Sequence, residues 1–351
     1  MCYTYVIISE VKVKNIFIVT GANGFLGNNV IRQIFDKYDS EEIEIRALTH
    51  RGSTKPNALV GLNCKVYDGD VLKTETLEDI FNVPKECNVF VIHCAAIVSI
   101  KAKSDPLIYN VNVVGTKNIV KKTLEIGAKL IYISSVHVFT EKPNEEEITE
   151  VSVFEPDKVV GVYAKTKAEA ANFVLDAVKT QGLDACIVHP SGMIGPNDFG
   201  MTHLTKLIKD IANGDFRIMV KGGYNFVDVR DVAEAVVNAC SLGKKGECYL
   251  LSNKVMTIRE TADIVCDFVG IKRIKFNVPM WLCKMFAPVC ELYYNMRKIP
   301  PLFTKLSLYT ITSNGNFSNN KAKQVLMFNP RPLKTTIEDT VSWLKKMGRV
   351  K

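Results

Sequence analysis

The chain has 351 residues, 47% of them hydrophobic and 23% charged, and its 45 Lys and Arg against 37 Asp and Glu give a formal net charge of +8. Such a length can bury a large core in one large or two modest domains of an ordinary soluble globular protein. The excess charge favours anionic ligands such as phosphorylated cofactors, but no basic-aromatic array is present, so nucleic-acid binding is not expected.

The first clear element follows residues 1–14, which lack the basic start of a signal peptide and are interpreted as a short extension. Four apolar residues at 16–19 predict a buried parallel strand, and the glycines that follow are spaced G-x-x-G-x-x-G before a helical pattern. Glycines allow the sharp turn and the close approach of a pyrophosphate, which the helix N-terminus attracts. The expected cofactor contacts here are Gly21, Asn23, Gly24, Phe25, Leu26 and Gly27.

Strands and helices then alternate along the chain. After a helix to about residue 36, the patterns predict strands at 43–48, 65–67, 88–96, 129–135 and 184–189, and helices at 74–81, 107–126 and 163–179. This alternation predicts an α/β fold with a Rossmann-type doubly wound parallel sheet, whose ligand lies beyond the carboxyl ends of the strands.

The alternation loosens after Pro190. Residues 204–212 read as a helix, the chain is expected to return to the sheet for 226–241 and 247–252, and the remainder is mostly helical, closing with an amphipathic helix at 337–344. We therefore expect a dinucleotide-binding domain of residues 1–190 and 226–252 and a smaller, mostly helical substrate lobe of residues 191–225 and 253–351. A small-molecule substrate is expected in the cleft between them.

The ten cysteines form no C-x-x-C pair and have no histidine partners at ligand spacing. Buried, reduced thiols in a cytoplasmic protein are the expected arrangement, without a metal site.

The end of the second strand bears on the choice of cofactor. Thr49, His50 and Arg51 follow one another there and no acid is present to bind the ribose 2′-OH of NAD, so NADP is favoured and NAD remains the alternative. Asp70 and Val71 end the third strand on the same edge, where they are expected near the adenine, although Asp70 also suits an ordinary helix entry.

The chemistry is expected from Tyr163 and Lys167, which are four residues apart and so share one face of a predicted helix. The Lys167 ammonium and an oxidised nicotinamide would both lower the pKa of the Tyr163 phenol, an otherwise poor acid or base. Ser135, at the end of the fifth strand, could stabilise the same substrate oxygen. Such a Tyr and Lys pair alone usually marks a helix surface, and the preceding glycine turn is what favours a catalytic role.

Together these segments resemble the extended short-chain dehydrogenase/reductases, a group that includes dihydroflavonol reductase-like, 3β-hydroxysteroid dehydrogenase-like and nucleotide-sugar epimerase-like proteins. The matching segments are TGANGFLG at 20–27, HCAA at 93–96, NVVGTKN at 112–118, YISSVHVF at 132–139, YAKTK at 163–167, HPSGMIGP at 189–196 and GGYNFVDVRDVA at 222–233. The resemblance implies that Tyr163 is the general acid/base, that Lys167 binds the nicotinamide ribose and that Ser135 positions the reacting oxygen. It further implies a supporting or proton-relay role for Asn112, cofactor contacts at Ala95, Ala96, Pro190 and Met193, and a homodimer built on a four-helix bundle.

Two positions depart from the family pattern. Nucleotide-sugar members commonly carry an arginine that grips the diphosphate where this chain has Tyr224, which lowers the expectation of such a substrate. His189 replaces an arginine before Pro190 and is interpreted as a tolerated change at a sheet end. Arg230 and Asp231 are expected to form a structural pair, with Asp231 capping the following helix.

The segment at 278–290 is rich in apolar and aromatic side chains but too short and interrupted to span a bilayer. Core packing of the smaller lobe is the first interpretation. A lid over a hydrophobic sterol- or flavonoid-like substrate and contact with a membrane surface are the alternatives, the latter being less favoured.

We expect an enzyme that transfers a hydride between NADP(H) and a secondary alcohol or ketone of a small hydrophobic molecule. The alternative is an NAD-dependent epimerase or dehydratase acting on a sugar or nucleotide sugar, which would retain its cofactor. A redox-sensing protein without catalysis is disfavoured, because it has no need of Ser135, Tyr163 and Lys167.

Overall fold

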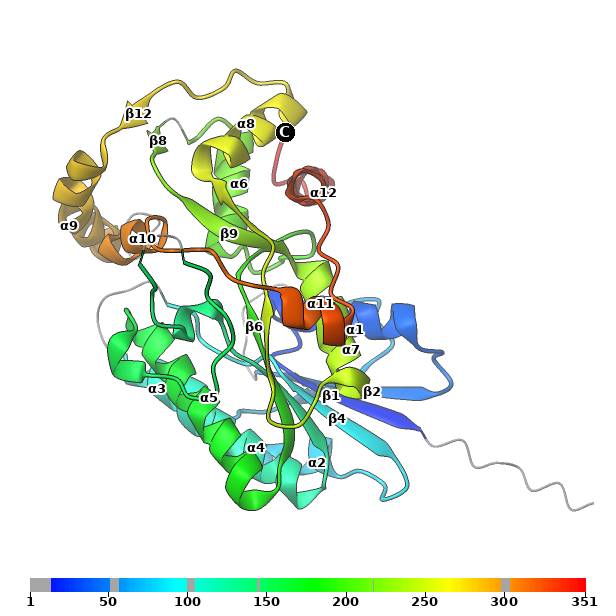
Figure 1. Ribbon diagram of the computed structural model, residues 1–351. Helices are drawn as coiled ribbons and strands as arrows, with labels where there is room; N and C mark the ends of the chain where they lie inside the picture. Colours follow the sequence, from blue (N-terminus) through cyan, green and yellow to red (C-terminus); the bar gives the residue numbers. More distant parts are fainter. Residues whose placement is uncertain (1–13, 51–56, 100–104, 144–145, 217, 298–303) are drawn as a thin grey trace, which may run out of the picture.

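The computed structural model describes residues 14–50, 57–99, 105–143, 146–216, 218–297 and 304–351. Its centre is a seven-stranded sheet with the order β10-β6-β5-β4-β1-β2-β3, in which every neighbouring pair is parallel (Figure 1). The strands are β1 (Asn15–Thr20), β2 (Ile43–Thr49), β3 (Lys65–Asp68), β4 (Asn88–His93), β5 (Lys129–Ile133), β6 (Asp184–Pro190) and β10 (Cys248–Leu251). The predicted Rossmann-type parallel sheet is confirmed.

Helices cover both faces of this sheet, as expected for strands joined by right-handed crossovers. The larger ones are α1 (Phe25–Lys37), α4 (Gly115–Glu125), α5 (Val162–Gln181) and α7 (Val229–Leu242), with the short α2 (Glu78–Phe81), α3 (Pro106–Tyr109) and α11 (Asn320–Leu326) beside them. Apolar side chains of α1, α7 and α11 fill one buried core, and those of α2, α4 and α5 fill the other. The sheet is therefore buried on both sides, which explains its near-continuous apolar strands.

The strand order reverses between β1 and β4, because the chain leaves β1 toward β2 and β3 and later resumes at β4 on the other side. Helices that follow these two strands diverge, and the resulting crevice at the carboxyl ends of the strands is where α/β sheets bind ligands. The glycine turn after β1 and residues 94–97 after β4 meet at this point.

The predicted helix at 107–126 is continuous but not regular. α3 leads into a π-helical turn at Asn110–Val114 before α4 begins. Such turns insert one residue into a helix and occur frequently at functional sites.

The expectation that residues 226–241 return to the main sheet is wrong. β9 (Gly223–Asp228) instead lies in a separate three-stranded sheet of order β11-β9-β7, with β7 (Gly192–Ile194) and β11 (Lys254–Thr257), and residues 229–242 form the helix α7. The apolar run in α7 is buried because this helix packs against α1 and the sheet, so hydrophobicity alone did not distinguish a buried helix from a buried strand. β10 does join the main sheet, as expected for 247–252.

The predicted pairing of Arg230 with Asp231 is also wrong. Asp228, not Asp231, caps α7 by accepting from the Arg230 backbone N–H at 2.8 Å, and it forms an ion pair with the Arg230 guanidinium at 2.7 Å. Asp231 instead accepts from the Arg331 side chain at 2.7 Å, 100 residues further along the chain. Both carboxylates thus tie α7 to the C-terminal part of the chain.

The remaining elements form the smaller lobe (Figure 1). Besides the three-stranded sheet it contains the strand pair β8 (Met219–Val220) and β12 (Asn277–Val278), and the helices α6 (His203–Ala212), α8 (Ile258–Val269), α9 (Met280–Arg297), α10 (Lys305–Thr310) and α12 (Leu333–Lys346). α6, α8 and α12 share one apolar core. The smaller, mostly helical lobe therefore exists, whereas the exact domain boundaries proposed from the sequence stay a prediction.

Only one face of the apolar segment at 278–290 packs into a core. Cys283 and Ala287, one turn apart, are buried against α10, whereas Trp281 and Met285 on the opposite face are 67% and 55% exposed. Core packing therefore explains only part of this segment. Within the described ranges, no helix is long and apolar enough to cross a membrane.

Candidate active site

The glycine turn between β1 and α1 is closed by its own backbone. The Gly24 N–H donates to the Gly21 carbonyl at 2.8 Å, and Gly21 has a φ of +64°. A Cβ at Gly21 would lie 2.8 Å from the Cα of Ala95, and one at Gly27 would overlap the Gly21 carbonyl oxygen. Only glycine fits at these positions, because neighbouring backbone occupies the space a side chain needs.

The N-terminus of α1 is open toward this turn. Gly24 is its N-cap residue and contributes no side-chain hydrogen bond, so the first N–H groups of a 13-residue helix remain available to an external acceptor. The dipole of the helix adds partial positive charge at the same point. The cradle therefore fits the pyrophosphate of a dinucleotide.

The other predicted residues of this motif have different surroundings. Leu26 is buried in the core and Phe25 is packed against it, so only their backbone atoms face the turn. The Asn23 carboxamide oxygen accepts from the Ala58 N–H at 2.6 Å, which fixes the chain after β2.

Two residues predicted to choose the cofactor, His50 and Arg51, follow β2 in the sequence. His50 is exposed, and Arg51 lies outside the described residues. The Thr49 hydroxyl donates to the carboxylate of Asp68, at the end of the neighbouring β3, at 2.8 Å. An acid therefore does stand near this edge, although it comes from β3 and not from β2.

Asp70 and Val71 follow β3. The Asp70 carboxylate accepts from the Leu72 N–H at 2.9 Å and so orders the local turn, as in the helix-entry alternative. Val71 is buried, and its side chain occupies the space beside Gly115, at the start of α4. Its carbonyl accepts from the Asn118 carboxamide at 2.9 Å.

Ser135 and Tyr163 meet although 28 positions separate them in the sequence. Ser135 follows β5, and its Oγ accepts from the His137 N–H at 3.3 Å, capping a short 3-10 turn. The Ser135 hydroxyl beside the Tyr163 phenol acts to lower the pKa of that phenol, which favours the phenolate. Burial opposes this effect and is larger, so it raises the pKa of Tyr163 to about 12.

Lys167 lies one helical turn after Tyr163 on α5 and is only 2% exposed. Its ammonium donates to the Ile133 carbonyl at 2.5 Å and stands 4.3 Å from the centroid of the Tyr132 ring. Burial lowers the pKa of Lys167 to about 7. Burial and the Ser135 hydroxyl account for the shift of the Tyr163 pKa, and the lowering expected from Lys167 together with an oxidised nicotinamide stays a prediction.

Asn112 is fully buried in the π-helical turn. Its side-chain oxygen accepts from the Ile97 N–H at 2.8 Å, and its amide donates to the Ile97 carbonyl at 3.1 Å and to the Thr166 hydroxyl at 3.1 Å. Thr166 in turn donates to the Tyr163 carbonyl at 2.9 Å. Asn112 thus joins the segment after β4 to the first turn of α5.

Sequence reasoning missed a chain of buried hydrogen bonds around His93. The Thr116 hydroxyl donates to the Asn112 carbonyl at 2.7 Å, so its oxygen accepts from His93 Nε2–H at 3.1 Å. His93 Nδ1 is then the acceptor for the Thr20 hydroxyl at 2.7 Å. Burial lowers the pKa of His93 to about 3, which keeps the ring neutral in this arrangement. The HCAA motif contained His93, but nothing in its spacing predicted these partners.

Pro190 ends β6, and Met193 in β7 packs on the core beside Val227. His189 before them is fully buried between the rings of Phe139 and Phe154, with centroids 5.0 and 5.2 Å away. Burial lowers the pKa of His189 to about 3, and its Nδ1 lies 3.3 Å from the Ser135 carbonyl oxygen. His189 is therefore a neutral core residue that supports the Ser135 backbone.

Ala95 and Ala96 follow β4 and are half-buried. The Ala95 N–H donates to the Thr20 hydroxyl at 3.2 Å, which holds this segment against the glycine turn. The structure thus brings together the glycine turn and the residues after β4, and separately Ser135, Tyr163, Lys167 and Asn112.

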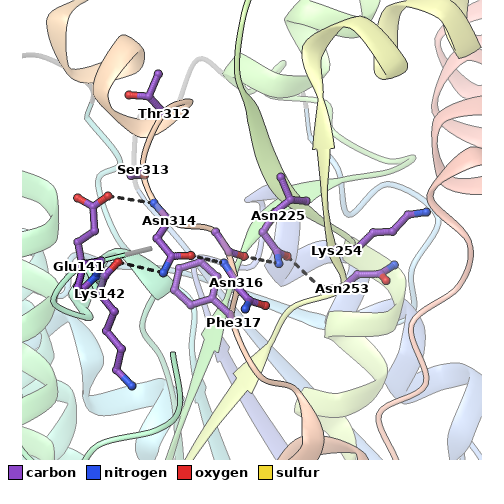
Figure 2. Close-up of a pocket in the computed structure, with 13 residues that line it drawn as sticks. Glu141, Lys142, Asn225, Asn253, Lys254, Thr312, Ser313, Asn314, Asn316 and Phe317 are labelled. Carbon is purple, nitrogen blue, oxygen red and sulfur yellow. Dashed lines mark hydrogen bonds between the residues drawn. The ribbon is translucent and has the colours of Figure 1, made fainter. Parts of the chain in front are cut away.

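A cavity of about 950 Å³ lies between the two lobes, and none of these residues lines it (Figure 2). Its walls are rich in polar side chains that already have partners. Asn314 donates to the Glu146 carbonyl at 2.8 Å, and Asn225 donates to the Gly315 carbonyl at 2.9 Å. This region is a hydrogen-bonded seam between the lobes. Among the described residues, no group of three or more His, Cys, Asp or Glu side chains could hold a metal ion.

Comparisons with known proteins agree with this geometry. The profile of the NAD dependent epimerase/dehydratase family matches residues 17–252. A Methylococcus capsulatus protein described as sterol demethylase protein B is 28% identical, covering 95% of this chain and 99% of its own length. A putative dihydroflavonol 4-reductase of Synechocystis is also 28% identical, covering 97% and 98%.

Among solved structures, the crystal structure of gox2253 has a TM-score of 0.81 and 29% identity, and the match covers 96% of this chain and 99% of that one. The family match spans more than half of the chain and contains the glycine turn and all four proposed catalytic residues. The chain therefore belongs to the NAD dependent epimerase/dehydratase family, the extended short-chain dehydrogenase/reductases, and is an NAD(P)-dependent oxidoreductase.

Proposed function

We propose that this enzyme interconverts a secondary alcohol and a ketone on a hydrophobic ring molecule of the sterol or flavonoid kind. The observation that carries the proposal is the placement of Ser135, after β5, beside Tyr163 on α5, with Lys167 one turn further along that helix, in the sheet that carries the glycine turn after β1. The two relatives described above support the substrate class, because one is named for a sterol and the other for a dihydroflavonol.

The nicotinamide supplies the hydride in reduction and accepts it in oxidation when it is bound. With a pKa raised to about 12, Tyr163 keeps its proton at neutral pH and can donate it to the carbonyl oxygen of the substrate. Ser135, already within hydrogen-bonding reach of that phenol, holds the same oxygen and stabilises the charge that develops on it.

In the same proposal Lys167 binds the nicotinamide ribose and stabilises negative charge on Tyr163 after the proton has left. Asn112 positions the catalytic helix through Thr166, since its carboxamide links that residue to Ile97. These roles follow the family pattern at matching positions, together with the contacts around each side chain.

A hydrophobic substrate is supported by Tyr224, which occupies the place of the diphosphate-binding arginine in nucleotide-sugar members. Its ring lies 5.6 Å from that of Phe226 and packs beside Val220 and Met280, so this position offers an apolar surface and no positive charge. The alternative, an epimerase or dehydratase acting on a sugar or nucleotide sugar, would need its anion-binding groups elsewhere.

For the cofactor we propose NADP over NAD. His50 and Arg51 follow β2 at the place where family members bind the adenosine ribose, and basic groups suit a 2′-phosphate. Asp68 is the group that would instead favour NAD. Arg51→Ala should weaken NADPH binding about tenfold more than NADH binding in a fluorescence titration. Asp68→Asn should leave the preference for NADPH intact, and a stronger loss of NADH than of NADPH in this variant would favour NAD.

We further propose a homodimer formed through α4 and α5. Leu107, Tyr109 and Val114, on the helical segment that packs with α5, are between 37% and 51% exposed and would be covered by such a bundle. Analytical ultracentrifugation would show a dimer, and Leu107→Glu should shift it to the monomer.

We also propose a cytoplasmic location, because the nine cysteines within the described residues are free.

The test of the reaction is a panel of sterol ketones, flavonoid ketones and nucleotide sugars incubated with NADPH, followed by loss of its absorbance. We expect oxidation with at least one ring ketone. Tyr163→Phe should abolish turnover and keep NADPH binding, whereas Tyr109→Phe, which changes an exposed phenol on α3, should retain activity. Tightly bound NAD with no net cofactor use would support the epimerase alternative. No turnover by a cofactor-loaded enzyme across the panel would contradict the proposal.

A further inference from the structure

The outer face of α9 exposes large apolar side chains that no other described element covers. Trp281 is 67% exposed, Met285 55% and Phe286 49%, whereas Cys283 and Ala287 on the inner face are almost fully buried. Trp281 and Met285 are one helical turn apart and therefore project from the same side. The helix therefore has an apolar inner face that is buried and an outer face that exposes large apolar side chains.

The neighbouring strands extend this apolar face. β12 pairs with β8, and the Met219 N–H donates to the Phe276 carbonyl at 2.8 Å, which places Phe276 directly beside that strand. Phe276 is 67% exposed and Ile218, next to β8, is 43% exposed. Figure 1 shows β8, β12 and α9 together at one outer edge of the smaller lobe. We call the exposed residues Ile218, Phe276, Trp281, Met285 and Phe286 the α9 face.

Positive charges lie beside these apolar side chains. Lys275 precedes Phe276, Lys284 lies between Trp281 and Met285 on α9, and both are exposed. Neither forms an ion pair with a carboxylate within the described part of the chain, whereas Arg273 is paired with Asp267 at 2.5 Å. The α9 face therefore presents unpaired ammonium groups at its rim.

We propose that the α9 face docks on the surface of a bilayer that contains anionic phospholipids. Tryptophan and phenylalanine favour the boundary between headgroups and acyl chains, and lysines beside them attract anionic headgroups. A second copy of the chain fits less well, since a two-fold contact would put the rim lysines of both copies into one interface, and lysine is depleted from protein interfaces. The helix lies on the bilayer and does not cross it.

Docking at this face would place lipid next to α10, which packs against the residue before the start of α5, the helix that carries Tyr163. α9 packs on α10 through Cys283 and Leu308, and the side chain of Leu306 in α10 lies against Gly161, two residues before Tyr163. A ring substrate dissolved in the bilayer would then have a short path to the site. This consequence rests on the proposed function, whereas the docking itself does not and is tested without substrate or cofactor.

The two tryptophans of the chain make docking directly measurable. Trp343 is packed edge-on against Phe199 with centroids 5.5 Å apart, so only Trp281 is placed to enter lipid. Vesicles of phosphatidylcholine with about one-third phosphatidylserine should float the full chain and shift its emission to the blue. Trp281→Phe should lose the shift and Trp343→Phe should retain it.

Charge variants test the role of the rim. Lys284→Gln and Lys275→Gln should each weaken binding to the anionic vesicles about fivefold, as expected for loss of one lysine near the surface. Lys85→Gln, a matched change of an exposed lysine in the loop before β4, should have no effect. Circular dichroism and thermal melting would check that each variant is folded.

Three results would overturn the proposal. The first is failure of the folded chain to float with the anionic vesicles, and the second is equal binding by the three lysine variants. The third is a blue shift of Trp281 that grows with protein concentration in the absence of vesicles, which would assign the α9 face to a second copy. Loss of turnover with intact vesicle binding would affect only the proposed function.

Discussion

Replacing Lys167 by methionine is expected to stabilise the folded chain. In the unfolded chain this lysine is protonated at neutral pH, but burial lowers its pKa to about 7 in the folded state. The folded chain must therefore lose this proton or bury the charged ammonium, which costs about 4 kcal/mol at pH 7 when the pKa falls from its ordinary value to about 7. Methionine fills a similar volume without this cost.

The gain is partly offset, because the variant loses the hydrogen bond from Lys167 to the Ile133 carbonyl, a contribution of about 1 kcal/mol. We expect a net stabilisation of about 2 to 3 kcal/mol at pH 7. A group with a lowered folded-state pKa destabilises most below that pKa, and the penalty fades as pH rises toward the pKa of the unfolded chain. The advantage of the variant should therefore shrink by between about 1 and 2 kcal/mol from pH 7 to 8.5.

Urea unfolding followed by circular dichroism at both pH values measures this directly. Lys165→Met, a change of an exposed lysine on the same helix, is the matched control and should alter stability little. A Lys167→Met chain that is less stable than the natural one at pH 7, or whose advantage grows with pH, would refute the reasoning. Stabilisation with loss of activity would mean that Lys167 is needed for activity although it lowers the stability of the fold.

Three further changes probe the frame of the site. Gly21→Ala should lower the unfolding free energy by about 1 to 3 kcal/mol and weaken NADPH binding, because its φ is positive and backbone fills the space of a Cβ; unchanged binding and melting would contradict this. Asp231→Asn should cost about 2 kcal/mol in urea unfolding by breaking the buried contact with Arg331, a loss that Arg331→Lys should only partly reproduce. Thr20→Val should cost about 2 kcal/mol by leaving the buried His93 ring without its donor, and a chain of unaltered stability would argue against the hydrogen-bond chain.

Local sequence patterns determined the frame of this protein. The apolar strand at 16–19, the glycine turn and the helix after it are neighbours in the chain, so their spacing was enough to predict the element, its open helix end and the parallel sheet around it. The pairing of Tyr163 with Lys167 on one helical face was predictable for the same reason.

Tertiary structure decided what lies far apart in the chain or depends on burial. Apolar periodicity could not tell that β9 leaves the main sheet, since buried strands and buried helices look alike over short runs. The partners of His93, at positions 20 and 116, and the link of Asp231 to Arg331 come together only on folding. The direction of the Tyr163 pKa depends on desolvation, which has no signature in the order of residues. Which apolar side chains of α9 stay exposed likewise depends on which face of the helix packs into the core, and the sequence pattern did not indicate that face.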